Sequence, residues 1–275
     1  MEIKNGDQIY QLGELVAEAE MYRLYLCKQV VTNRQCLLQI STGIEHNGSI
    51  ERNAFFLNEL QRRAEIVEAE YAKVRTRPDS VLNYQLGFPE LVDSFVCPEQ
   101  GERRINILAF RNVEAVNKMV PLSGITEKDH LRVDMRTSAW IFGKLLKLLV
   151  FAHSEDILVK QLGAGNILIE PDQHYVLIFD WSDALTFVGA IPEEYRRDEI
   201  SAVAEAVAYV LGTNPTTGVF PDDGEPAFND YSHYLFHLVN RNERNALRAH
   251  QNFYELIDKL WPRGFHKFTT KPLNS

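Results

Sequence analysis

The order of strand-like and helical segments is the feature of this sequence that most constrains its fold. Short runs rich in aromatic and aliphatic residues, typical of antiparallel strands, dominate the first third of the chain. They lie at residues 9–16, 21–31, 35–41, 88–96 and 104–112. Residues 49–74 have helical periodicity, with an apolar face at Phe55, Phe56, Leu60, Ile66 and Val67. This order predicts a five-stranded antiparallel sheet with one prominent helix in residues 1 to about 110.

The chain becomes mainly helical after about residue 125. Helical patterns lie at residues 134–154, 197–212, 230–240 and 244–261. Between the first two of these helices, residues 166–180 are typical of a β-hairpin that turns at Pro171–Asp172. The longest apolar stretch has 14 residues and contains two lysines, so it is too short to span a bilayer. We therefore expect a buried helix there and no membrane partner.

Composition and charge argue against several classes of protein. The chain has 275 residues, 45% of them hydrophobic, which is enough for a sizeable core. Its net charge of −9 gives a nucleic-acid partner little electrostatic support. The three cysteines, Cys27, Cys36 and Cys97, lack metal-ligand spacing and indicate reduced thiols in a cytoplasmic protein. The polar, acidic N-terminus does not have the character of a signal peptide.

Several stretches of the sequence resemble protein kinases. Residues 10–28, "YQLGELVAEAEMYRLYLCK", resemble the first two strands of a bacterial Ser/Thr kinase. Residues 153–169, "HSEDILVKQLGAGNILI", align without gaps with the kinase catalytic loop and the strand that follows it. The kinase "DFG" element corresponds to Asp180–Ser182, and the aspartate of a later buried helix corresponds to Asp198. The resemblance covers roughly residues 8–262 and implies an α+β, protein kinase-like two-lobed fold.

The resemblance implies one kinase-like domain with an N-lobe at residues 1–111 and a C-lobe at residues 112–275. In kinases, a glycine-rich loop of the N-lobe lets the backbone approach the ATP phosphates. The three glycine positions hold Ala17, Ala19 and Tyr22 in this sequence. A tyrosine at the tip of the loop must either fold over the nucleotide site or fill it.

The charged pair that contacts the phosphates in kinases is also missing. The strand lysine of the family corresponds to Gln39, whose neutral amide can donate a hydrogen bond but carries no charge. The helix glutamate that pairs with this lysine corresponds to Glu59, or to Glu65 or Glu68 if the register slips. The resemblance therefore implies that the usual ion pair of the fold is absent.

The apolar residues that would sandwich adenine are only partly preserved. Leu24 and Leu168 match the family's residues above and below the ring. Leu37 stands where the family has an alanine that packs flat against adenine, and leucine has three more carbons. Two interpretations stay open: Leu37 is an ordinary core residue, or it fills the place of adenine. Both interpretations predict weaker ATP binding.

The segment that resembles the kinase catalytic loop lacks the catalytic aspartate. The histidine, arginine and aspartate of the kinase motif correspond to Val159, Lys160 and Gln161. The aspartate accepts or orients the substrate hydroxyl proton, and Gln161 cannot serve as a base near neutral pH. Asn166 and Asp180 match the two metal-holding positions of the family. They either hold Mg²⁺ together with nucleotide phosphates or brace the loop and hairpin by hydrogen bonds.

These substitutions predict a catalytically inactive kinase-like domain, a pseudokinase that acts as a regulatory or protein-binding module. We expect weak or absent ATP binding, no resident cofactor, and another protein as its partner. One alternative is an atypical phosphotransferase that uses ATP and Mg²⁺ and recruits Asp183, Asp156 or Glu155 as a displaced base. A second alternative is a structural assembly module that holds a partner through its acidic surface or its cleft.

Overall fold

The chain forms two compact units in the computed structural model. The described residues are 1–77, 81–113, 115–213, 218–221, 224–262 and 264–273. The first unit comprises Met1–Val120 together with Phe179–Asp183, and the second comprises Pro121–Ile178 and Ala184–Ser275. The sequence predicted lobes at residues 1–111 and 112–275. These lobe bounds stay a prediction, because the two units divide the chain differently.

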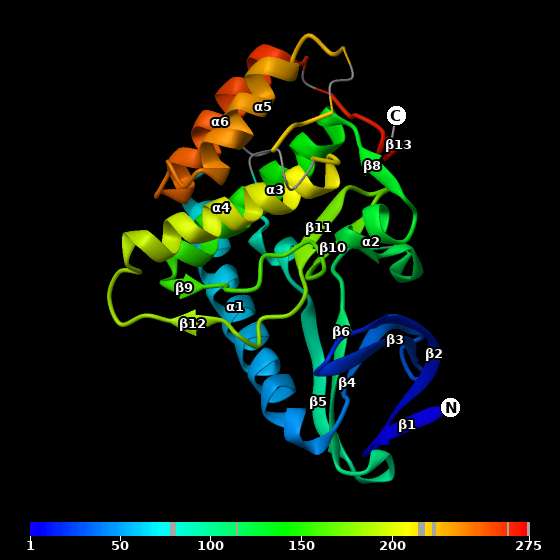
Figure 1. The fold of residues 1–275 in the computed structure, drawn as a ribbon. Helices are drawn as coiled ribbons and strands as arrows, with labels where there is room; N and C mark the ends of the chain where they lie inside the picture. Colours follow the sequence, from blue (N-terminus) through cyan, green and yellow to red (C-terminus); the bar gives the residue numbers. More distant parts are fainter. Residues whose placement is uncertain (78–80, 114, 214–217, 222–223, 263, 274–275) are drawn as a thin grey trace. The chain divides into compact units, whose positions relative to one another are not determined.

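An antiparallel sheet forms much of the first unit (Figure 1). Its strands follow the order β1-β2-β3-β4-β6-β5. They are β1 (Glu2–Asn5), β2 (Gln8–Glu18), β3 (Tyr22–Gln29), β4 (Arg34–Ser41), β5 (Glu90–Cys97) and β6 (Arg103–Ala109). Strands β2 to β6 correspond to the five predicted strands, which are confirmed together with the antiparallel pairing.

The predicted number of five strands was wrong, because β1 adds a sixth. β1 pairs with β2 from Glu2 opposite Gln11 to Asn5 opposite Gln8. Ile3 is buried and belongs to the core of the sheet. The strand has four residues and one large apolar side chain, which is too short for an alternating pattern to reveal it.

One long helix, α1 (Asn47–Val74), packs on β4, β5 and β6 of the same unit. It follows a short 3-10 turn, η1 (Ile44–His46), and confirms the helix predicted at residues 49–74. Its buried stripe consists of Ile50, Asn53, Ala54, Phe56, Leu57, Leu60 and Ala64. Phe55 and Ile66, which were expected on the apolar face, are exposed instead.

Helices dominate the second unit. They are α2 (Leu122–Glu127), α3 (Met135–Ser154), α4 (Glu193–Val210), α5 (Phe228–Val239) and α6 (Ala246–Leu260). The buried helix α3 contacts both α4 and α6, and α5 packs on α4. Gly143 of α3 permits close contact with α6, because a Cβ there would lie 2.9 Å from the Tyr254 hydroxyl. The mainly helical character predicted after about residue 125 is confirmed.

Short strands complete the second unit. The predicted hairpin at residues 166–180 is confirmed by the antiparallel pair β10 (Ile167–Glu170) and β11 (Tyr175–Ile178). Two further antiparallel pairs join β9 (Ile157–Leu158) to β12 (Leu185–Thr186) and β8 (Leu131–Val133) to β13 (Thr270–Pro272). The remaining short elements of the first unit are η2 (Tyr84–Gly87), η3 (Pro98–Gln100) and η4 (Val116–Lys118), and β7 (Val120–Pro121) lies at the boundary between the two units in the sequence. Within the described ranges, none of the helices combines the length and apolar character required to cross a membrane.

A buried phenol ties β1 and β2 to β5. The Tyr10 hydroxyl donates to Asp93 Oδ2 at 2.9 Å, and Asn5 Nδ2 donates to the same oxygen at 2.9 Å. Burial, and then the Asp93 carboxylate, raise the pKa of Tyr10 well above its ordinary value. The hydroxyl therefore stays protonated and works as a fixed donor to the carboxylate.

We predict that Tyr10→Phe lowers the free energy of unfolding by about 1–2 kcal/mol, because hydrogen bonds to charged acceptors contribute that much when buried. Urea unfolding followed by circular dichroism measures the change. The matched control is Tyr209→Phe, whose hydroxyl donates to Glu127 at the surface and should contribute less than about 0.5 kcal/mol. Equal losses in the two variants would contradict the structural role assigned to Tyr10.

Candidate functional site

Three of the predicted nucleotide-site residues lie on one face of the sheet. Leu24 of β3 is directly opposite Gln39 of β4, and Leu37 lies two residues before Gln39. Directly opposed residues share a face of the sheet, as do residues two apart along a strand. All three side chains are buried, and Leu37 is flanked by Leu26 on one side and Leu108 on the other. Leu37 therefore belongs to a closed apolar layer of the first unit.

Gln39 lies in a cluster of buried amide side chains, which we call the amide cluster: Gln39, Asn53 and Asn106. Asn53 Nδ2 of α1 donates to Gln39 Oε1 at 2.9 Å, and Asn106 Nδ2 of β6 donates to the same oxygen at 3.1 Å. Asn106 Nδ2 also donates to the Ile50 carbonyl at 2.8 Å. Asn53 Oδ1 accepts the Trp181 backbone N–H at 2.9 Å. Neutral hydrogen bonds thus join the sheet, the helix and the Trp181 backbone.

The structure brings Asn53, rather than the expected Glu59, into contact with Gln39. The Glu59 carboxylate pairs instead with two neighbours on the same helix, Arg62 at 2.9 Å and Arg63 at 3.4 Å. Asn53 is 0% exposed, whereas the Glu59 side chain is 27% exposed. The short connection between β4 and α1 explains the difference, because it brings an earlier turn of the helix opposite Gln39.

The tip between β2 and β3 is a tight hairpin. The Ala19 backbone N–H donates to the Tyr22 carbonyl at 2.9 Å, so this amide already has an acceptor. Ala17 pairs with Leu24 within the strand ladder. The Tyr22 ring lies against Phe179 with 5.9 Å between ring centroids. Burial raises the pKa of Tyr22, and the nearby Asp180 carboxylate adds to the shift. The Tyr22 ring therefore lies beside the segment that holds Asp180, and whether it folds over a nucleotide site or fills it stays a prediction.

Asp180 is buried, and hydrogen bonds hold it in its own segment. Its Oδ1 accepts the Ser182 backbone N–H at 2.9 Å. Burial raises the pKa of Asp180, although the hydrogen bonds from Ser182 counteract part of the shift. Trp181 is fully buried and packs edge-on against Phe88 at 6.3 Å. These contacts hold Asp180 within its own segment, and the choice between bracing and metal holding stays a prediction.

In the second unit, Asn166 braces the loop that contains Gln161. Asn166 Nδ2 donates to the Gln161 carbonyl at 2.9 Å, and the Asn166 backbone N–H donates to the Gly163 carbonyl at 2.9 Å. Leu168 lies on β10 opposite Leu177 and is buried. Asn166 thus donates through Nδ2 to the loop backbone, which both the bracing and the metal-holding interpretations allow.

A buried carboxylate that sequence reasoning missed, Glu199 of α4, holds the same loop. Glu199 Oε1 accepts the Lys160 backbone N–H at 2.6 Å, and Glu199 Oε2 lies 2.9 Å from His153 Nε2. Lys160 has a left-handed backbone with φ of 72°. Asp198, which was matched to the aspartate of a buried helix in kinases, is half exposed and pairs with Arg241 at 3.4 Å. The residue that anchors the loop is therefore Glu199, because its position on α4 faces the core beside Val203.

The predicted metal pair remains a prediction. Asp180 belongs to the first unit and Asn166 belongs to the second. Among the described residues, no group of three or more His, Cys, Asp or Glu side chains is placed to hold a metal ion. The two residues supply one carboxylate and one amide; Asp180 Oδ1 accepts from the Ser182 backbone, whereas Asn166 donates through Nδ2, a bond that does not involve its oxygen.

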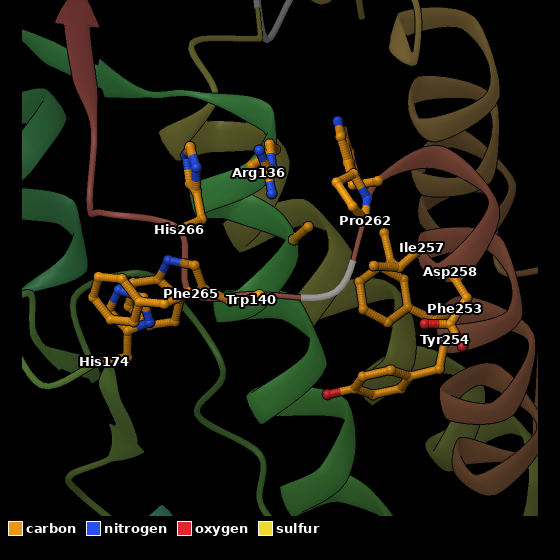
Figure 2. Close-up of a pocket in the computed structure, with 13 residues that line it drawn as sticks. Arg136, Trp140, His174, Phe253, Tyr254, Ile257, Asp258, Pro262, Phe265 and His266 are labelled. Carbon is orange, nitrogen blue, oxygen red and sulfur yellow. The ribbon is translucent and has the colours of Figure 1, made fainter.

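The second unit also contains a hollow of about 180 Å³ between α3 and α6. Figure 2 shows Trp140, His174 and Phe265 gathered at one side of it. His174 stacks on Trp140 and on Phe265, with 4.4 Å between ring centroids in both cases. The lining side chains are mostly apolar, together with Arg136, His174, Asp258 and His266.

Comparison with known proteins identifies the architecture. No family model matches the sequence, and no curated protein sequence matches it. Among solved structures, the chain is similar to vaccinia related kinase 3, with a TM-score of 0.62 and 14% identity. The match covers 94% of this chain and 90% of that chain. The chain has a protein kinase-like fold.

The protein kinase-like fold gives the amide cluster its context. In active kinases, a strand lysine and a helix glutamate form the ion pair that must be in place for catalysis. In this chain, Gln39 of β4 and Asn53 of α1 are joined by a hydrogen bond. Asn53 could have been suspected from the sequence, because it is a polar residue between Ile50 and Leu57 on an otherwise apolar stripe.

Proposed function

We propose that this kinase-like chain is a pseudokinase: it does not transfer phosphate and acts as a regulatory or protein-binding module. The proposal includes weak or absent ATP binding, no resident metal, and a protein partner. The observation that carries it is the amide cluster, in which neutral, fully buried side chains occupy the strand–helix link of the fold.

Electrostatics supports this proposal. Phosphoryl transfer depends on positive groups that stabilise the charge of the phosphates and of the transition state. Gln39 carries no charge, and its Oε1 already accepts hydrogen bonds from Asn53 and Asn106. A phosphate near this cluster would therefore gain no ion pair from Gln39.

Steric contacts and the missing base add to the argument. Tyr22 lies against Phe179, and Leu37 is 0% exposed within its apolar layer. Gln161 stands at the position that corresponds to the catalytic aspartate and has no carboxylate to accept a proton. Positioned acid–base groups contribute about 10²–10⁴ in rate, so this single replacement already removes most of the expected activity.

A phosphoryl-transfer assay with radiolabelled ATP, Mg²⁺ and a general protein substrate tests the proposal. We predict no transfer above the enzyme-free background for the wild type, and none for Gln161→Asp. The single restoration should fail because groups that act as one unit are strongly non-additive, and the charge at Gln39 would still be missing.

The matched variant Gln161→Ala separates the two functional interpretations. If the wild type transferred phosphate and Gln161→Ala abolished the transfer, Gln161 would be a working catalytic residue and the pseudokinase proposal would fail. Transfer that survives in Gln161→Ala but is lost in Asp183→Asn would instead identify an atypical phosphotransferase with a displaced base.

A further inference from the structure

Two of the three cysteines face each other across neighbouring strands. Cys27 of β3 is directly opposite Cys36 of β4 in the antiparallel register. Directly opposed residues of antiparallel strands have Cα atoms about 4.5–5.5 Å apart. Disulfides span Cα separations of about 4.4–6.8 Å. The backbone therefore already holds these two thiols at a separation that a disulfide can bridge.

The two thiols also interact with each other. Both belong to the same buried cluster on the sheet face opposite Leu37 and Gln39. A hydrogen bond between the side chains lowers the pKa of Cys36, and the same hydrogen bond, followed by burial, raises the pKa of Cys27. Each thiol therefore affects the ionisation of the other, and Cys36 also lies 3.9 Å from the Arg34 carbonyl, to which its Sγ donates.

Access to the pair is narrow. Cys27 is 5% exposed and Cys36 is 0% exposed. An open hollow of about 410 Å³ lies beside Cys27, but Lys28 and Gln35, which line it, project from the sheet face opposite the two thiols. We therefore expect a small peroxide to reach Cys27 first, by local opening on the thiol face of the sheet.

We propose that Cys27 and Cys36 are a site of reversible oxidation, at which a peroxide converts the two thiols into a cross-strand disulfide. One thiolate attacks a peroxide oxygen and becomes a sulfenic acid, releasing hydroxide that takes up a proton as water. The partner thiol then attacks the sulfenic sulfur, forms the S–S bond and expels a second water. In total, the two thiols lose two electrons and two protons, and one hydrogen peroxide becomes two waters.

The disulfide would fix the hairpin that carries the central site residues. Leu24, Leu37 and Gln39 project from the other face of the same two strands. A covalent bond between the strands would lock their register and restrain the layer around Leu37. The inference goes beyond the proposed function and does not depend on whether the chain binds nucleotide.

Cys97 serves as an internal control. It lies on β5, and β6 separates β5 from β4 in the sheet. Neighbouring strands are about 4.8 Å apart, so two intervening steps place Cys97 beyond disulfide distance from Cys36. Its thiol donates instead to Glu99 Oε2 at 3.4 Å. Oxidation confined to the pair should therefore leave Cys97 reduced.

The test is mild peroxide treatment of the folded full-length chain, followed by thiol titration and tryptic mapping. We expect the titratable thiols to fall from three to one, and dithiothreitol to restore them. Trypsin should release Leu24–Lys28 linked to Gln35–Arg52, with a mass lower by two hydrogens than the sum of the two peptides. Cys97→Ser should still form the link, whereas Cys27→Ser and Cys36→Ser should each abolish it.

Several results would overturn the proposal. One is retention of all three thiols in the folded chain under peroxide that fully oxidises the denatured chain. Another is a linked peptide that contains Cys97, or irreversible oxidation of Cys27 and Cys36 to sulfinic or sulfonic acids without any link. Because Cys97→Ser leaves the pair intact, a folding defect in one of the other variants does not prevent the test.

Discussion

Glu199→Ala is expected to lower the free energy of unfolding by about 3 kcal/mol or more. The carboxylate accepts from the Lys160 backbone and contacts His153, and the side chains of both Glu199 and His153 are at most 6% exposed. Each buried donor left without an acceptor costs about 1–3 kcal/mol, and removal of one member of a buried polar pair is strongly destabilising. Urea unfolding followed by circular dichroism measures the loss.

Asp198→Ala is the matched control, since it removes a carboxylate from the preceding position of the same helix. Its side chain is half exposed and pairs with Arg241 at 3.4 Å, so the loss should stay within about 0.5 kcal/mol. Glu199→Gln keeps one acceptor oxygen, so its loss in the free energy of unfolding should lie between those of Glu199→Ala and Asp198→Ala. A larger loss in Asp198→Ala than in Glu199→Ala would contradict the assignment of Glu199 as the residue that anchors the loop.

Sequence patterns predict elements well where the burial pattern is regular. The long aliphatic strands, α1 and the buried helix α3 follow from periodicity, because their core faces repeat along the element. β1 is too short for such a repeat, and its place depends on Ile3 and on the hydrogen bond from Asn5 to Asp93. That contact joins residues far apart in the chain, so local reasoning cannot find it.

The site shows the same distinction. The absence of a charge at Gln39 and of a carboxylate at Gln161 follows from aligning motifs with the kinase pattern. The identity of the residue that contacts Gln39 cannot be read from the alignment, because it depends on the length of the connection between β4 and α1. Glu199 was missed for a related reason: two adjacent acids on α4 look alike in sequence, and only the direction each side chain faces distinguishes a buried anchor from a surface residue.

Nucleotide is expected to leave the stability of the wild-type chain unchanged. A micromolar site saturated with millimolar ATP would add about 4 kcal/mol to the free energy of unfolding. In a domain of this size, such a gain raises the melting temperature by several degrees. The buried Leu37, the neutral amide cluster and the inward Tyr22 ring all argue against a site of this kind.

A designed triple variant should gain the ATP binding that the wild type lacks. Leu37→Ala removes three carbons from the apolar layer, and Gln39→Lys combined with Asn53→Glu replaces a neutral hydrogen bond by the ion pair of active kinases. The triple variant should gain an ATP-dependent shift before any phosphoryl transfer is measurable, because Gln161 is unchanged. A shift in the triple variant and none in the wild type would assign the loss of binding to these three residues.

The most direct measurement is therefore the melting temperature of the wild-type chain without nucleotide, with millimolar ATP, and with millimolar ATP and Mg²⁺ together. The neutral amide cluster predicts the same melting temperature in all three conditions. An increase of several degrees that requires both ATP and Mg²⁺ would show that the wild type holds a working nucleotide site, and it would contradict the proposal that this kinase-like chain acts without one.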